Sequence, residues 1–158
     1  MFFKKKIALR DFCRQKLDFI LSDEGKALAD DCRKQCGADF VSNSDADQYL
    51  AHFRGAFLQL LGVAFSRTLK RDQRYDVMSF EKEYLNSNGM GELEDIHRLY
   101  NSAFGSSFVD GVEQMALCLA EQFQTSGVDA TSIARVHYDG FYNVLRELFD
   151  EIKKVKLV

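Results

Sequence analysis

Three histidines, His52, His97 and His137, are candidates for acid–base chemistry or for ligation of a metal or haem. Each falls on a different predicted helix. His97 ends the segment Glu94-Asp95-Ile96-His97, which has the Glu-x-x-His spacing of ferritin-like di-iron bundles. Those bundles need this pair twice and a glutamate from each of two further helices. No glutamate stands three or four positions before His52 or His137. Glu94 and His97 are therefore metal-ligand candidates that lack the other ligands of a di-iron site.

Cys32 and Cys36 lie four residues apart on one face of a predicted helix and could supply half of a structural zinc site. No second Cys/His pair has suitable spacing. Cys36 also stands near the C-terminal end of its helix, where the negative end of the dipole disfavours a thiolate. We therefore expect Cys13, Cys32, Cys36 and Cys118 to be reduced, unpaired thiols, and we expect no bound metal or cofactor.

The chain contains none of the common catalytic motifs. It has no Gly-x-Ser-x-Gly nucleophile elbow, no glycine-rich phosphate loop with a lysine, and no His-Glu-x-x-His. We therefore expect binding rather than catalysis.

Long helices must position these candidate residues, because the 158-residue chain has no proline and its turn signals are few and widely spaced. Apolar periodicity and capping patterns predict an all-α single domain over residues 1–158, built from six or seven helices. The two longest helices should pack at its centre. The expected helices are 7–21, 23–36, 45–70, 76–85, 91–104, 108–123 and 129–156.

The 45–70 helix should be surrounded by other helices, because residues 53–65 are apolar on almost all sides. Gly55 and Gly62 lie two turns apart in it and cost helix propensity, which close approach of a neighbouring helix would justify. Arg67, Lys70, Arg71 and Arg74 cluster where this helix should end, and we interpret them as partners of the helix dipole.

The last helix has the most regular pattern. Its apolar residues follow each other at alternating steps of four and three, which is the heptad repeat of a knobs-into-holes seam. This seam predicts either the spine of the bundle or a homodimer interface. Its members are Ala134, Tyr138, Phe141, Leu145, Leu148, Ile152 and Val155.

The order of helices from His97 to the C-terminus resembles the end of a globin. His97 lies in a short helix, Gly105-Ser106-Ser107 breaks that helix, and two long helices follow. The resemblance implies a haem held by His97. The chain departs from the globin pattern in having no proline at a corner and in the length of the 45–70 helix.

Composition indicates a globular protein, with 46% apolar and 28% charged residues. The net charge of −3 argues against a general nucleic-acid binder. The longest apolar run, residues 56–65, is too short to span a bilayer, so we expect no integral membrane segment. Four cysteines without a signal peptide favour the cytoplasm.

The function that these observations favour is a non-catalytic regulatory or protein-interaction domain that self-associates through the heptad seam. The alternative is a haem-binding, metal-binding or ligand-sensing domain of globin-like or ferritin-like type. A ligand sensor would need a cavity in the aromatic core, for which Phe53, Phe57, Tyr138 and Phe141 are the expected lining.

Overall fold

The computed structural model describes residues 3–105 and 108–158, apart from the side chains of residues 108 and 109. Within them the chain forms eight α-helices and two short strands, so the all-α class is confirmed. All seven expected helices are present, together with the short α3, which was not predicted. The elements are β1 (Lys5–Ile7), α1 (Leu9–Leu21), α2 (Asp23–Gln35), α3 (Ala38–Asn43), α4 (Ala46–Thr68), α5 (Arg71–Ser87), α6 (Leu93–Phe104), α7 (Phe108–Gln122), the 3-10 turn η1 (Gln124–Ser126), α8 (Ala130–Lys154) and β2 (Val155–Leu157).

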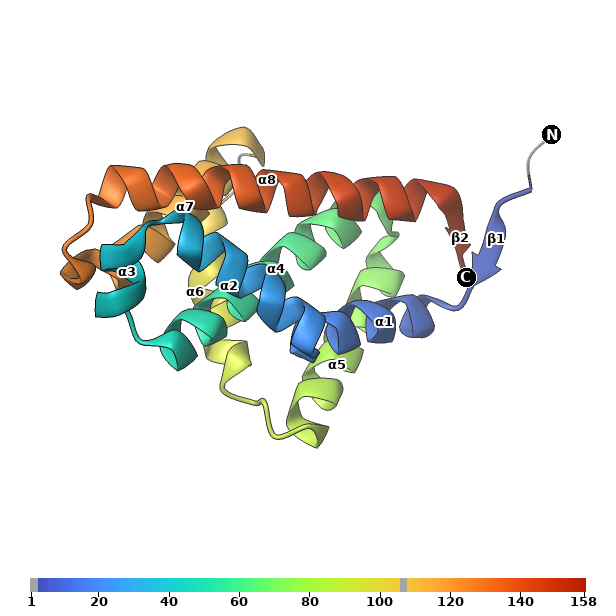
Figure 1. Cartoon of the computed structure of the whole chain (residues 1–158). Helices are drawn as coiled ribbons and strands as arrows, with labels where there is room; N and C mark the ends of the chain where they lie inside the picture. Colours follow the sequence, from blue (N-terminus) through green and yellow to red (C-terminus); the bar gives the residue numbers. More distant parts are fainter. Residues whose placement is uncertain (1–2, 106–107) are drawn as a thin grey trace.

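The long helices α4 and α8 form the frame on which the others pack (Figure 1). Helices α4, α6, α7 and α8 make a closed ring of contacts. In the view of Figure 1, α8 runs along the top, α1 and α2 lie in front, and α5 extends from the bottom of the molecule. Helix α5 packs mainly on α1 and less on α6, and it makes few contacts with α4.

Helix α4 begins where Asp45 accepts a hydrogen bond from the Gln48 N–H at 2.8 Å. Its middle is buried on nearly all sides, as its apolar composition predicts. The expected close approach of a neighbour is found at Gly55, where an added Cβ would lie 2.3 Å from Cγ2 of Ile96 on α6. At Gly62 an added Cβ would meet only Nε2 of His97, at 3.9 Å. Packing therefore explains the first glycine and leaves the second unexplained.

The heptad seam of α8 is buried within the monomer, against α7, α4 and α2. Phe141, Leu145, Leu148 and Ile152 are buried as predicted. Tyr138, in contrast, is only half-buried. Ile133 and His137 are completely buried at this end of the helix, because a straight α-helix drifts by about 20° per heptad relative to a strict seven-residue repeat.

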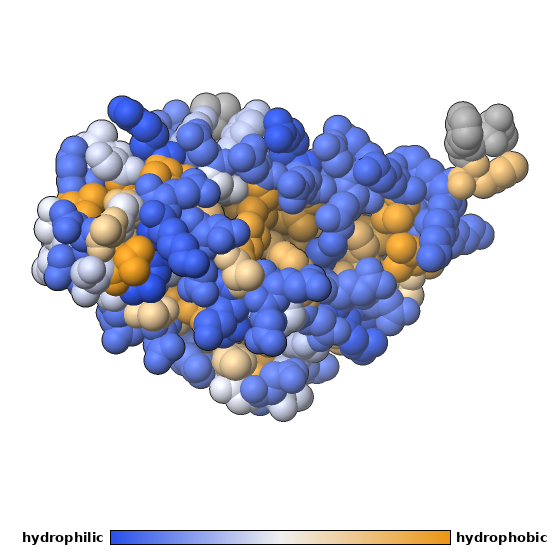
Figure 2. Space-filling view, viewed as in Figure 1, coloured by the Kyte–Doolittle hydropathy of each residue, from blue (hydrophilic) through white to orange (hydrophobic). Residues whose placement is uncertain are grey.

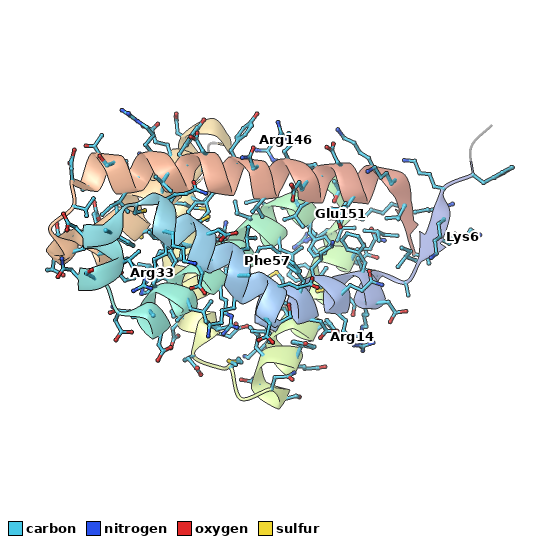
Figure 3. All side chains as sticks on the ribbon, in the orientation of Figure 1. Lys6, Arg14, Arg33, Phe57, Arg146 and Glu151 are labelled. Atoms are coloured by element: carbon cyan, nitrogen blue, oxygen red, sulfur yellow. The ribbon has the colours of Figure 1, made fainter. Side chains whose placement is uncertain are left out.

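The opposite face of α8 is exposed, as the side chains in Figure 3 show. Glu147, Asp150, Lys153 and Lys154 are all exposed, as the seam predicts. Arg146 points away from the body of the molecule, whereas Glu151 is directed towards α1. There the Glu151 carboxylate forms an ion pair with Lys16. The heptad seam therefore divides α8 into a buried face and a charged face.

Residues next to α1 and α8 form strands rather than the predicted helical ends. β1 and β2 pair in parallel, with Lys5 opposite Val155 and Ile7 opposite Leu157. Alternation of apolar and lysine residues in Val155-Lys156-Leu157 suits a half-buried strand. The expectations that helices would begin at Ile7 and extend to Lys156 were wrong for this reason.

Figure 2 shows a mostly hydrophilic surface in the view of Figure 1, with apolar residues visible between α8 and the α1–α2 pair and at the end near α3. Among the described residues, no helix has the length and apolar character needed to cross a membrane. The predicted break at Gly105-Ser106-Ser107 includes residues 106 and 107, which lie outside those described.

Candidate ligand-binding site

His52 and His137 lie in the core, where each bonds to a tyrosine. Nδ1 of His52 is 3.0 Å from the Tyr100 hydroxyl. Nε2 of His137 is 2.6 Å from the Tyr49 hydroxyl, and its Nδ1 is 2.7 Å from the Ile133 carbonyl oxygen. Burial lowers the pKa of both imidazoles, that of His137 to about 4. Both are satisfied core histidines.

His97 has a different environment, because it bridges α4 and α5 beside a cavity. Its Nε2 is 3.2 Å from Oε1 of Gln59 on α4. Its Nδ1 is 3.1 Å from Oε1 of Glu81 on α5. Glu94, one turn before His97 on α6, lines the same cavity. The structure thus brings the predicted pair together with Gln59 and Glu81, which the sequence analysis did not identify.

The cavity lies between α4, α5 and α6 and has a volume of about 680 Å³. This size is within the range of about 300–1,000 Å³ typical of small-molecule sites. It exists because the short Leu69–Lys70 link turns the chain sharply, so that α5 diverges from α4 as the second arm of a V (Figure 1). The two arms make few contacts, and His97 connects their middle parts.

Apolar side chains from all three helices line much of the cavity, and polar groups lie at its ends. Gly62 also lines it, and its missing side chain leaves the α4 backbone accessible. The apolar lining residues are Leu61, Val63, Phe65, Val77, Met78 and Phe104, with Cys13 contributed by α1.

The carboxylates at the His97 end are poorly solvated. Oε1 of Glu81 is buried and accepts no well-aligned hydrogen bond from a described residue, although His97 is close. Burial, and then repulsion from Glu81, raises the pKa of Glu94. Burial, and then the charge of Glu81, also raises the pKa of the Cys13 thiol to about 12. This end of the cavity is therefore a place where a hydrogen-bond donor or a cation would be stabilised.

The opposite end of the cavity is basic, with Arg67, Arg71 and Arg74 among its lining residues. Only Arg67 lies in the last turn of α4, where a cation complements the helix dipole. Arg71 and Arg74 belong to the first turns of α5, next to the positive end of its dipole. Our interpretation of these two arginines as dipole partners was wrong, because the chain begins a new helix one turn earlier than expected.

The other sequence-based candidates do not meet at this site. Cys36 Sγ is directed at the Cys32 carbonyl oxygen at 3.5 Å, and all four cysteines are free. None of Phe53, Phe57, Tyr138 and Phe141 lines the cavity. The rings of Phe53 and Phe141 instead pack together at 6.2 Å, so side chains fill the space expected for a ligand.

Ligation of a metal or haem by His97 would need a free ring nitrogen, and a metal ion would also need further ligands nearby. The described part of the chain contains no group of three or more His, Cys, Asp or Glu side chains placed to hold a metal ion. Both nitrogens of the His97 ring have a close partner, and Gln59 faces it directly. A porphyrin bound to His97 between α4 and α6 would have to displace Gln59.

Three of the cavity residues stand out in the sequence, although we interpreted them differently. Gly62 was expected to allow helix packing, and Arg71 and Arg74 were expected to complement a helix dipole. Glu81 has no such signal, because its position opposite His97 depends on the angle of the V. Comparison of the chain with family models, with curated proteins and with solved structures found no match.

Proposed function

We propose that this protein is a non-catalytic regulatory domain that binds a small, elongated ligand in the cavity between α4, α5 and α6. The observation that carries the proposal is a cavity of about 680 Å³ beside a bundle whose core is otherwise filled with packed aromatic side chains. Apolar surface in a cleft of this size stays in contact with water, and its removal from water is favourable. A ligand that fills the cleft removes this surface from water.

Gly62 supports a binding role independently of the volume. A glycine inside a helix costs about 0.5–1 kcal/mol relative to alanine. At Gly62 an alanine Cβ would fit, because the nearest atom, Nε2 of His97 on α6, would lie 3.9 Å from it. Close approach of a ligand to the α4 backbone gives this position a reason to remain glycine.

Helix α5 would transmit binding to a protein partner. It is attached mainly to α1 and carries the exposed side chains Tyr75 and Met78, which are 58% and 64% exposed. A ligand that bridges α4 and α5 would fix the angle of the V and hence the position of these two side chains. The heptad seam of α8 is buried within the monomer, so this transmission to a partner does not use it. Four free thiols support a reducing, cytoplasmic setting.

The proposal is tested by titrating the protein with N-phenyl-1-naphthylamine, a neutral dye whose fluorescence rises in apolar surroundings. We expect saturable binding to the unmodified protein. Gly62→Leu should weaken it at least tenfold, because its side chain would extend from α4 into the cavity beside His97. Gly62→Ala adds only a methyl group beside the α4 backbone, so it should weaken binding measurably but less than Gly62→Leu.

Circular dichroism of both variants checks that the helices are retained. Absence of saturable dye binding to the unmodified protein, or equal binding to the folded Gly62→Leu variant, would contradict the proposal.

A further inference from the structure

We infer that the ligand of this cavity is an elongated zwitterion, with an anionic group at the α4–α5 turn, an apolar middle and an ammonium group at the Glu81–His97 end. This inference rests on the proposed function and adds the chemical class and the orientation of the ligand. Its basis is a gradient of side-chain chemistry that two walls of the cavity share.

The α5 wall changes from basic to apolar to acidic along the helix. Arg71 and Arg74 come first, Val77 and Met78 follow, and Glu81 is last. Arg74 and Glu81 are seven residues apart, so both project from nearly the same face of the helix. The rise of 1.5 Å per residue places their Cα atoms about 10 Å apart along the axis.

The α4 wall shows the same gradient, but along this helix the polar residue comes first and the basic residue last. Gln59 lies at the His97 end, Gly62 and Phe65 follow, and Arg67 lies at the turn. Because the turn joins the C-terminal end of α4 to the N-terminal end of α5, the basic ends of both walls meet there. The polar ends meet at His97, which contacts Gln59 and Glu81.

The basic end is suited to a carboxylate or another anion. Arg74 is half-buried, and it makes no hydrogen bond or ion pair with any described residue. The adjacent N-terminus of α5 adds the positive end of a helix dipole. An anion held there would pair with the Arg74 guanidinium and offset the unfavourable placement of two cations at this helix end.

The acidic end is suited to an ammonium group. Oε1 of Glu81 is buried and lacks an aligned donor, and Glu94 is nearby and half-buried. An ammonium group would donate to Glu81 and relieve the repulsion between the two carboxylates. Arg98 also lines the cavity at this end, but its exposed guanidinium pairs with Asp95 at 3.3 Å, and Oε1 of Glu81 still lacks an aligned donor.

The test is a competition experiment in which unlabelled compounds displace N-phenyl-1-naphthylamine. 8-Aminooctanoate carries both charged groups at about the required separation. Octanoate lacks the ammonium group and octylamine lacks the carboxylate. We expect 8-aminooctanoate to displace the dye at about tenfold lower concentration than either compound, which is the effect of one charge-assisted hydrogen bond.

Two variants test which end of the cavity binds the carboxylate and which binds the ammonium group. With Arg74→Gln, 8-aminooctanoate should compete no better than octylamine. With Glu81→Gln, it should compete no better than octanoate. The matched controls are Lys70→Gln and Glu83→Gln, which remove the same charges from exposed positions nearby that do not line the cavity. These controls should retain the tenfold preference.

The outcomes separate this inference from the proposed function. The dye could bind and be blocked by Gly62→Leu while the three compounds compete equally. In that case the proposed ligand class is wrong, but the cavity remains a binding site. If octanoate or octylamine competes best, the zwitterion is also excluded. If the dye itself does not bind, the proposed function fails first.

Discussion

His137 illustrates how neighbouring groups define the state of a buried side chain. The Ile133 carbonyl oxygen can only accept, so Nδ1 of His137 carries the ring proton. Nε2 therefore accepts the hydrogen bond from the Tyr49 hydroxyl. A second proton would have to be placed on Nε2, facing this hydroxyl, in a position with no solvent exposure. The folded protein consequently favours the neutral ring.

This state predicts a loss of stability in acid. Burial lowers the pKa of His137 from 6.5 to about 4, so the unfolded state binds the additional proton first as the pH falls. The stabilisation is fully present above pH 6.5 and declines between about pH 6.5 and 4, by about 3 kcal/mol in total. Urea denaturation at several pH values should show a smaller decline in His137→Gln than in the unmodified protein. Parallel curves for the two proteins would show that His137 is not the group responsible.

The two glycines of α4 should respond in opposite ways to alanine. Gly62→Ala should raise the free energy of unfolding by about 0.5–1 kcal/mol, because the methyl group has room and the helix propensity improves. Gly55→Ala should lower it by about 1–3 kcal/mol, because the new Cβ would lie 2.3 Å from Ile96 Cγ2. Chemical denaturation at one pH measures both. Similar changes in the two variants would mean that α6 does not pack on Gly55 as described.

Individual side chains were predictable where burial alone decides their environment. The burial of Phe141, Leu145, Leu148 and Ile152 follows from apolar spacing. The partners of His97 do not follow from spacing, because Gln59 and Glu81 come from helices whose relative angle the periodicity does not specify. Glu94, at helical spacing from His97, was the only neighbour that the sequence could indicate.

At the scale of the helix, α8 holds the bundle together through its buried seam. Leu148→Ala should lower the free energy of unfolding by about 2–5 kcal/mol, since Leu148 is only 3% exposed. Arg146→Ala on the exposed face is the control and should change it by less than about 0.5 kcal/mol. Because the seam is intramolecular, the unfolding midpoint should not depend on protein concentration. A midpoint that rises with concentration would indicate that the seam lies at a dimer interface.

Helices with strong periodicity were predicted well from the sequence, and segments stabilised by distant partners were not. The strand β2 forms because β1 lies beside it, although the two are about 150 residues apart in the chain. Helix α3 has six residues, too few for a periodic pattern to show. Helix α5 begins at Arg71 rather than Asp76, since Gln73 accepts a hydrogen bond from the Lys70 N–H and caps the earlier start.

At the scale of the whole molecule, the cavity results from the way α5 leaves the bundle. A short link sets α5 at an angle to α4, and its few apolar residues attach it to α1 rather than to α4. A sequence predicts which residues prefer to be buried, but it does not predict where three helices leave a space between them. We expected a cavity in the aromatic core, and the aromatic rings fill that region instead.

The most direct measurement of the central claim uses the methionine methyl groups as reporters. The chain has four methionines, of which Met78 lines the cavity and Met115 is fully buried in α7, away from it. Spectra of protein labelled with [methyl-¹³C]methionine are recorded while N-phenyl-1-naphthylamine is added, and Met78→Leu assigns the reporter signal. The Met78 signal should move progressively to saturation while the Met115 signal stays in place. A Met78 signal that does not move at saturating dye, or a shift confined to Met115, would contradict a binding site between α4, α5 and α6.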